Sequence, residues 1–121
     1  MGKLTLVAGA SQQPSRYSYK AVHLLKKFGH PIYLIGRNNA EVAGEPIHTS
    51  WPEKLEGLDT VTLYLNPVHQ QLVADQILML KPKRIIFNPG AENDELAFRA
   101  RREGIEVEYA CTLVMLNTGQ Y

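Results

Sequence analysis

The sequence is poor in cysteine, since Cys111 is the single one among 121 residues. One cysteine cannot form a disulfide within the chain, which favours a reducing compartment, and we therefore expect a cytoplasmic protein. No apolar run approaches the roughly 18 residues that a membrane-spanning helix needs, and the first residues lack the layout of a signal peptide. The sequence thus predicts no association with a membrane.

The chain also has no excess of one charge. The sequence has thirteen basic and twelve acidic residues. The net charge of +1 excludes a broad positive field that would attract nucleic acid. The four histidines show no spacing typical of a metal site, and Ser11 does not lie in a Gly-x-Ser-x-Gly nucleophile motif. We predict no metal site and no catalytic residue, and Cys111 is interpreted as a small buried apolar side chain.

Short apolar runs alternate with helical patterns along the whole chain. Buried strands are predicted at 4–8, 32–35, 60–65, 84–87 and 105–109, and helices at 17–28, 67–80, 93–103 and, as a single turn, 112–116. Residues 37–57 are less regular and predict a short strand at 46–48 and a turn or short helix at 52–55. This alternation predicts one α/β domain over 1–121, with a doubly wound, mainly parallel sheet and helices on both faces, as in Rossmann-like folds.

Two helices carry an apolar stripe at helical spacing. For the helix at 67–80 the spacing predicts a buried face made of Val68, Leu72, Val73, Ile77 and Leu80, and for the helix at 17–28 it predicts Tyr17, Ala21, Leu24, Leu25 and Phe28.

Small and polar residues follow four of the predicted strands. Open α/β sheets bind ligands beyond the carboxyl ends of their strands, and the loops at those ends are 9–11, 36–37, 66–67 and 88–90. We therefore expect a ligand site built from these loops.

The loop after the first strand suits a phosphate. Gly9 permits a sharp turn and close approach of a ligand, and the following helix directs its positive end toward the loop. Ser11 and Ser15 offer hydroxyl donors, and Arg16 offers a bidentate fork. The three-glycine fingerprint of dinucleotide sites is incomplete, because Ser11 and Pro14 stand where its second and third glycines would fall. A tight turn without a ligand is the alternative interpretation.

Arg37 follows the second strand, where an NAD site would place an acidic residue. An arginine there suits a phosphate carried on the ribose, which NADP has at its 2′ position and coenzyme A at its 3′ position.

Several segments together resemble the small CoA-binding proteins related to the nucleotide-binding domain of the succinyl-CoA synthetase α subunit. They are Val7-Ala8-Gly9-Ala10-Ser11, Pro14, Arg16-Tyr17-Ser18-Tyr19, Gly29-His30, Glu41-Val42-Ala43-Gly44, Val61 to Pro67, Phe87-Asn88-Pro89-Gly90, Asn93-Asp94-Glu95 and Gly104 to Val107 leading to Cys111. The resemblance implies a CoA or acyl-CoA lying across the strand ends, with Gly9, Ala10, Ser11 and Arg16 at the phosphates and Arg37 near the adenosine. It places Asn66 and Pro67 beside the nucleotide or pantetheine, and Asn88 to Gly90 near the thiol.

Three functions are compatible with these observations. The first is a CoA-binding module without chemistry of its own, and the second is an NADP-binding oxidoreductase or redox sensor. The third is an interaction protein that has lost its ligand. The related synthetases have further domains, so a ligase activity is expected to need a separate enzyme partner, and the sequence leaves homo-oligomers open.

Overall fold

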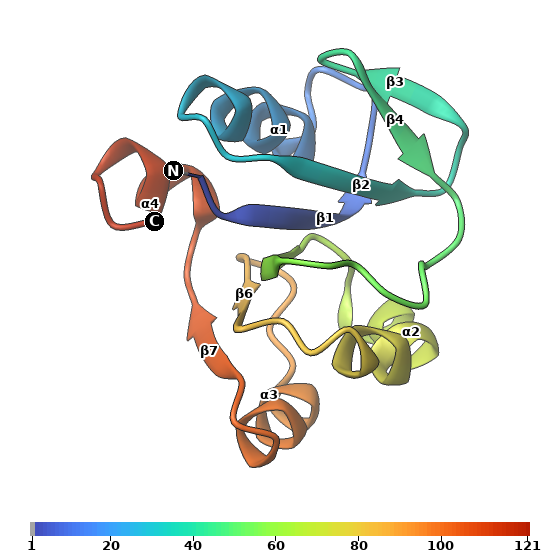
Figure 1. The fold of residues 1–121 in the computed structure, drawn as a ribbon, viewed down its shortest axis with the longest axis vertical. Helices are drawn as coiled ribbons and strands as arrows, with labels where there is room; N and C mark the ends of the chain where they lie inside the picture. The colour runs from blue at the N-terminus through green and yellow to red at the C-terminus, as the bar shows by residue number, and fades with distance from the viewer. Residues whose placement is uncertain (1) are drawn as a thin grey trace.

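Seven strands form one sheet in the computed structural model, which describes residues 2–121 (Figure 1). Their order across the sheet is β3-β4-β2-β1-β5-β6-β7. The strands are β1 (Leu4–Ala10), β2 (Ile32–Gly36), β3 (Ala40–Val42), β4 (Glu45–His48), β5 (Leu58–Leu63), β6 (Arg84–Phe87) and β7 (Glu106–Tyr109). The helices are α1 (Tyr17–Lys27), α2 (Pro67–Met79), α3 (Asp94–Arg102) and α4 (Thr112–Asn117).

Six of the strands are parallel, and β3 pairs antiparallel with β4 at one edge. Parallel neighbours need long crossovers, and α1, α2 and α3 supply them. The helices lie on both faces of the sheet, α1 and α4 on one and α2 and α3 on the other (Figure 1). The predicted doubly wound α/β sheet is confirmed.

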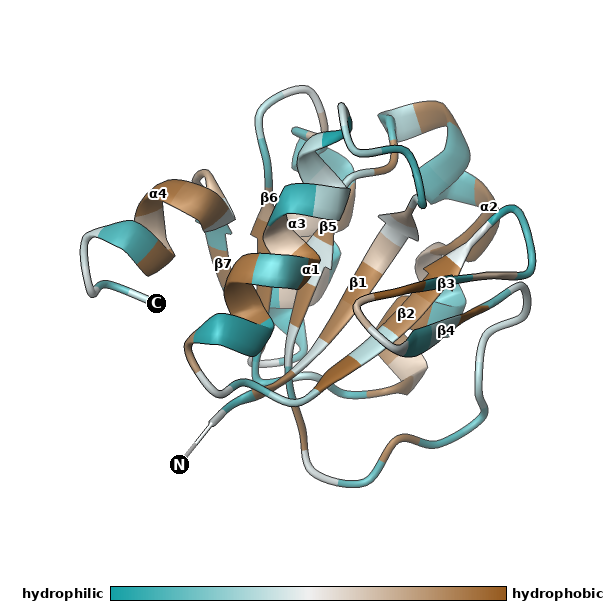
Figure 2. Ribbon diagram, turned by 90° about the horizontal axis from the view of Figure 1, so that it is seen from above, coloured by the Kyte–Doolittle hydropathy of each residue, from teal (hydrophilic) through white to brown (hydrophobic). Residues whose placement is uncertain are grey.

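The core has one layer on each face of the sheet. Alternate residues of β1 separate to the two layers, since Leu6 packs toward α2 and α3, whereas Val7 packs toward α1. The strands β1 and β2 at the centre of Figure 2 are mostly brown, and therefore mostly apolar, as expected for strands covered on both faces.

Residues 37–57 depart from the sequence expectations. The predicted strand at 46–48 is β4, but no helix forms at 52–55. The sequence pattern did not predict β3, which forms a hairpin with β4 through Ala43 and Gly44, both at positive φ. The strand predicted at 60–65 is β5, which runs from Leu58 to Leu63 and so lies two residues earlier in the sequence.

The predicted buried face of α2 is wrong at its first two members. Val68 is 69% and Leu72 is 79% exposed, while Gln70, Ala74, Ile77 and Leu78 are buried. Apolar residues occur all around this helix, so their spacing does not select one face. The buried amide of Gln70 bonds the loops beside the sheet and helps to set the face that turns inward. In α1, Tyr17 and Phe28 are likewise exposed, whereas Ala21 and Leu25 are buried.

Within residues 2–121, no helix combines the length and the apolar character that crossing a membrane requires.

Candidate functional site

The direction of winding reverses between β1 and β5. The chain passes from β1 through α1 to β2 on one side of β1, and from β5 through α2 to β6 on the other. Ala10 pairs with Gly36, and Ala8 pairs with Leu63, which in turn pairs with Phe87. The loops that follow β1, β2, β5 and β6 therefore share the carboxyl edge of the sheet, as the sequence predicted. Ligands of such sheets bind at this reversal point.

Gly9 occupies an irregular step at the end of β1. The register shifts between Ala8 and Ala10, and Gly9 has φ +96°, a conformation that side chains rarely adopt. A Cβ added at Gly9 would lie 3.2 Å from Cβ of Tyr64 and 3.3 Å from Cδ2 of Leu65. A glycine is thus required by both the backbone conformation and the approach of the chain after β5.

The segment between β1 and α1 is held by its own short-range bonds. The Ser11 hydroxyl accepts from the backbone N–H of Gln13 at 3.1 Å, and the Arg16 Nε donates to Gln13 Oε1 at 3.4 Å. Arg16 directly precedes the first turn of α1 in extended conformation, and it is exposed together with Ser15. An exposed cation therefore lies at the positive end of α1, an arrangement that favours an anion.

Gly36 brings β2 close to the same loop. A Cβ at Gly36 would lie 2.4 Å from the carbonyl oxygen of Ala10, so a side chain does not fit without movement of the backbone. Arg37 follows at once and is exposed. Ala10 and Gly36 are paired. The residues that follow them, Ser11 and Arg37, therefore leave the sheet at neighbouring positions of its carboxyl edge.

Asn66 and Pro67 begin α2 as the sequence predicted. The Asn66 side chain accepts from the backbone N–H of His69 at 2.9 Å, and Pro67 is the first helical residue. Both residues are exposed.

Gln70, one turn farther into α2, joins two loops of the site. It is fully buried, and its Nε2 donates to the carbonyl oxygens of Leu65 at 2.8 Å and Ala91 at 2.7 Å. The loops after β5 and β6 are therefore held at a fixed separation.

Asn88 is buried, and its side chain points inward. Its Nδ2 donates to Thr62 Oγ1 at 2.7 Å and to the Leu63 carbonyl at 2.9 Å, while Oδ1 accepts from the Thr112 N–H at 2.9 Å. These bonds use both N–H groups and the oxygen of the amide, so any contact of Asn88 with a ligand would come from its main-chain atoms. Gly90, with φ +93°, is exposed at the loop tip.

Tyr64 is a residue of this edge that the sequence analysis did not single out. Its hydroxyl is buried beside Thr62 and Thr112 without a hydrogen bond of regular geometry, and burial raises the pKa of the phenol more than these two hydroxyls lower it. A tyrosine that interrupts an apolar strand beside a polar loop is the signal that could have found it. Cys111 is partly buried and directly precedes α4.

Other features of the described residues lie away from this edge. Among residues 2–121 there is no group of three or more His, Cys, Asp or Glu side chains that could hold a metal ion. An open, mainly apolar groove of about 440 Å³ runs between α1 and α4, lined by Tyr19, Lys20, His23, Leu24, Lys27, Leu113 and Asn117.

A comparison with protein families identifies the family of the chain. The model of the family described as CoA binding domain matches residues 3–117. The chain belongs to this CoA-binding domain family. No match to the chain was found among curated proteins.

Solved structures share the architecture of this CoA-binding domain. A crystal structure of a protein described as uncharacterized is 47% identical, covers 100% of this chain and 99% of its own, and has a TM-score of 0.96. A Thermus thermophilus protein is 21% identical with TM-score 0.87, covering 99% of this chain and 91% of its own. A hypothetical protein from Pyrococcus horikoshii OT3 is 22% identical with TM-score 0.84, covering 96% and 82%. At these lower identities the likeness concerns the fold alone.

Proposed function

We propose that the chain binds coenzyme A or an acyl-CoA across the carboxyl ends of β1, β2, β5 and β6, and that it performs no chemistry of its own. The observation that carries the proposal is Gly9. Its positive φ and its contacts with Tyr64 and Leu65 keep a side chain out of the loop at the reversal point of a CoA-binding domain.

The diphosphate of CoA would lie against the loop of Gly9, Ala10 and Ser11 and the start of α1. Backbone N–H groups and the helix dipole favour negative charge there. Ser15 and Arg16 are exposed beside this loop and would add a hydroxyl and a guanidinium. Side chains of this kind can supply contacts for which dinucleotide sites use further glycines.

The two ends of CoA would extend to opposite sides of this loop. Arg37, at the end of β2, would meet the 3′-phosphate of the adenosine by a charge-assisted contact. Asn66 and Pro67 would border the nucleotide or the pantetheine. The main chain of the Asn88 to Gly90 loop would lie near the thiol, because the side chain of Asn88 is already bonded internally.

Titration of the protein with CoA, dephospho-CoA, NADP and NAD tests this function. Loss of the 3′-phosphate contact, worth roughly 1.5–3 kcal/mol, should weaken dephospho-CoA about ten- to a hundredfold relative to CoA. Thermal unfolding offers a second readout, since a ligand at about 100 times its Kd stabilises a fold by roughly 2.7 kcal/mol. We expect a clear shift with CoA and little with NADP or NAD.

An NADP-binding oxidoreductase or redox sensor is the alternative, and Arg37 is the residue that favours it, because a guanidinium also suits a 2′-phosphate. A larger thermal shift with NADP than with CoA would replace the first proposal by this one. Absence of binding to all four compounds would favour an interaction protein without a nucleotide.

A further inference from the structure

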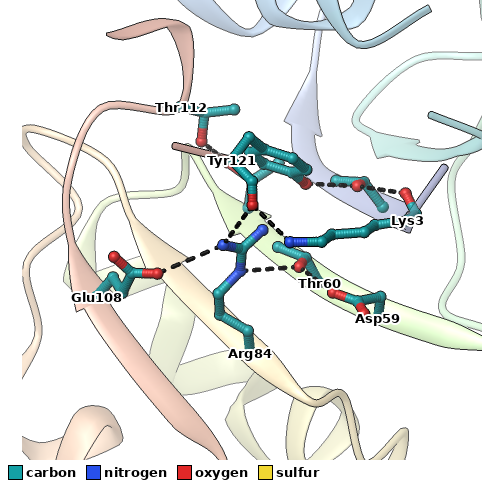
Figure 3. Close-up of polar contacts among 9 residues, drawn as sticks. Lys3, Asp59, Thr60, Arg84, Glu108, Thr112 and Tyr121 are labelled. Carbon is teal, nitrogen blue, oxygen red and sulfur yellow. Dashed lines mark hydrogen bonds and ion pairs between the residues drawn. The ribbon is translucent and has the colours of Figure 1, made fainter. Parts of the chain in front are cut away.

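A second polar cluster lies toward the amino ends of the strands, on the side of the sheet away from the proposed CoA site. Figure 3 shows Tyr121 folded against Lys3, Thr60 and Arg84, with Glu108 at the margin. The cluster joins the first strand of the sheet to the last described residue. Lys3 directly precedes β1, the other strand residues lie in β5, β6 and β7, and Tyr121 follows α4, so the fold assembles the cluster from distant parts of the chain.

Arg84, the first residue of β6, is the buried cation of this cluster. It is only 6% exposed, although a guanidinium is always charged. Its Nε donates to Thr60 Oγ1 at 3.0 Å, and its Nη1 donates to the main-chain oxygen of Tyr121 at 3.2 Å and to Glu108 Oε2 at 3.4 Å. The remaining nitrogen, Nη2, is buried and has no partner.

Lys3 brings a second cation to the same acceptor. Its Nζ donates to the main-chain oxygen of Tyr121 at 2.5 Å. The Tyr121 ring is held between these cations and β1: its centroid lies 4.5 Å from Cζ of Arg84, and its hydroxyl is 2.5 Å from Thr5 Oγ1. Two positive groups therefore converge on one oxygen.

The carbonyl oxygen of a peptide group would not balance this charge. Glu108 is the carboxylate paired with Arg84, and at 3.4 Å with a side chain 34% exposed it compensates only part of a buried guanidinium. The positive charges of this cluster also act on His30, whose ring centroid lies 4.8 Å from that of the Tyr121 ring. Burial lowers the pKa of His30, Lys3 and Arg84 lower it further, and Asp59 acts in the opposite direction.

The chemical complement of these two cations is an anion with two oxygens. A carboxylate can accept from Lys3 with one oxygen and from both terminal nitrogens of Arg84, which would give Nη2 the partner that it lacks. The structure assigns to Lys3 and Arg84 a carboxylate-binding site, separate from the proposed CoA site. On a chain that ends at Tyr121 the α-carboxylate of that residue supplies the group, and otherwise a small free carboxylate supplies it.

Two forms of the protein distinguish these sources. One ends at Tyr121, and the other carries Gly-Ser after Tyr121, which turns the same oxygen into a peptide carbonyl. Thermal unfolding of both is measured with sodium acetate and with sodium chloride at equal ionic strength. Each form is also measured with Lys3→Gln, and with Lys83→Gln as the matched control on an exposed lysine next to Arg84.

A terminal carboxylate predicts that the form ending at Tyr121 melts about 3 to 6 °C higher than the extended form. Lys3→Gln should remove this difference, and Lys83→Gln should retain it. A free carboxylate instead predicts that acetate, unlike chloride, stabilises the extended form saturably and that Lys3→Gln abolishes the effect.

The titration of His30, followed by NMR, is a readout independent of stability. A bound carboxylate should raise the pKa of His30 above its value in the extended form without acetate. If the two forms melt alike, acetate acts like chloride and the pKa of His30 is unchanged, no carboxylate site exists at Lys3 and Arg84.

Discussion

The side chain of Asn88 holds the backbone of Thr112: the Thr112 N–H donates to Asn88 Oδ1 at 2.9 Å. Through its Nδ2 the same amide bonds Thr62 and Leu63 of the neighbouring strand. One buried residue after β6 therefore connects β5 to the start of α4.

Asn88→Ala should lower the free energy of unfolding by about 2–4 kcal/mol, because it leaves several buried polar groups without partners. Asn66→Ala is the matched control, since it removes one exposed cap bond and should cost about 1 kcal/mol. Chemical denaturation of both variants measures the difference. Equal losses would contradict the connecting role of Asn88.

Gly9→Ala should weaken CoA binding at least about tenfold, which corresponds to about 1.4 kcal/mol. The new Cβ crowds Tyr64 and Leu65 and displaces the loop that would receive the diphosphate. Gly29→Ala is the control, because Gly29 has φ +83° but open space around its Cβ position. Both variants should lose about 1–3 kcal/mol of stability from backbone strain, and calorimetric titration should show a weakened Kd only for Gly9→Ala. Wild-type affinity in Gly9→Ala would remove the phosphate assignment of this loop.

Arg37→Ala should lower CoA affinity about ten- to a hundredfold and leave dephospho-CoA binding nearly unchanged. The gap between the two ligands in the wild type should thus disappear in the variant, because the contact with the 3′-phosphate is already lost. Arg101→Ala, which removes an exposed arginine of α3, should keep the gap. A gap that persists in Arg37→Ala would place the 3′-phosphate elsewhere.

Cys111→Ser should leave the Kd for CoA within a few-fold of the wild type. Cys111 precedes α4 without a side-chain cap bond, and serine is among the preferred residues at that position, so the thermal midpoint should stay level or rise. Mass spectrometry of the native protein under reducing conditions checks for adducts. A covalent acyl group or a CoA mixed disulfide on Cys111 would show that the thiol reacts.

Stability should fall as the pH drops below about 6.5, and His30 should cause part of the fall. The Lys3 N–H donates to His30 Nδ1 at 3.0 Å, and burial with nearby Lys3 and Arg84 lowers the pKa of His30 below its usual 6.5. The unfolded chain then binds the proton more readily, so stability is complete above pH 6.5 and decreases as the pH falls toward the lowered value. His30→Asn, which keeps an acceptor that does not titrate, should have a flatter pH dependence in denaturant unfolding. The same slope in both proteins would show that His30 does not contribute.

The strands and the edge of the sheet at which the loops meet could be predicted from the sequence. Strands covered on both faces are continuous apolar runs, and right-handed crossovers then bring their carboxyl ends together. The run 84–87 coincides with β6, and the loops of Gly9 and Asn88 lie at the carboxyl ends of β1 and β6, on either side of β5.

Features that depend on tertiary contacts could not be predicted in this way. The strand β3 forms through its pairing with β4. The buried face of α2 contains Gln70, whereas Val68 and Leu72 are exposed. The loop composition around Asn88 indicated a polar segment but not the direction of its side chain. Contacts of the loops with CoA stay predictions that the titrations test.

The central position of β1 also determines the order in which the sheet can be completed. β1 leaves the ribosome before both of its neighbours in the sheet, β2 and β5, and Leu6 stands opposite Val61 of β5. Until β5 has been synthesised, one side of β1 has no strand to pair with, and parallel pairing at such separations closes large loops at an entropic cost. We therefore expect the nascent chain to expose an apolar edge of β1 until β5 emerges, which makes this interval the one in which a chaperone would most readily engage it.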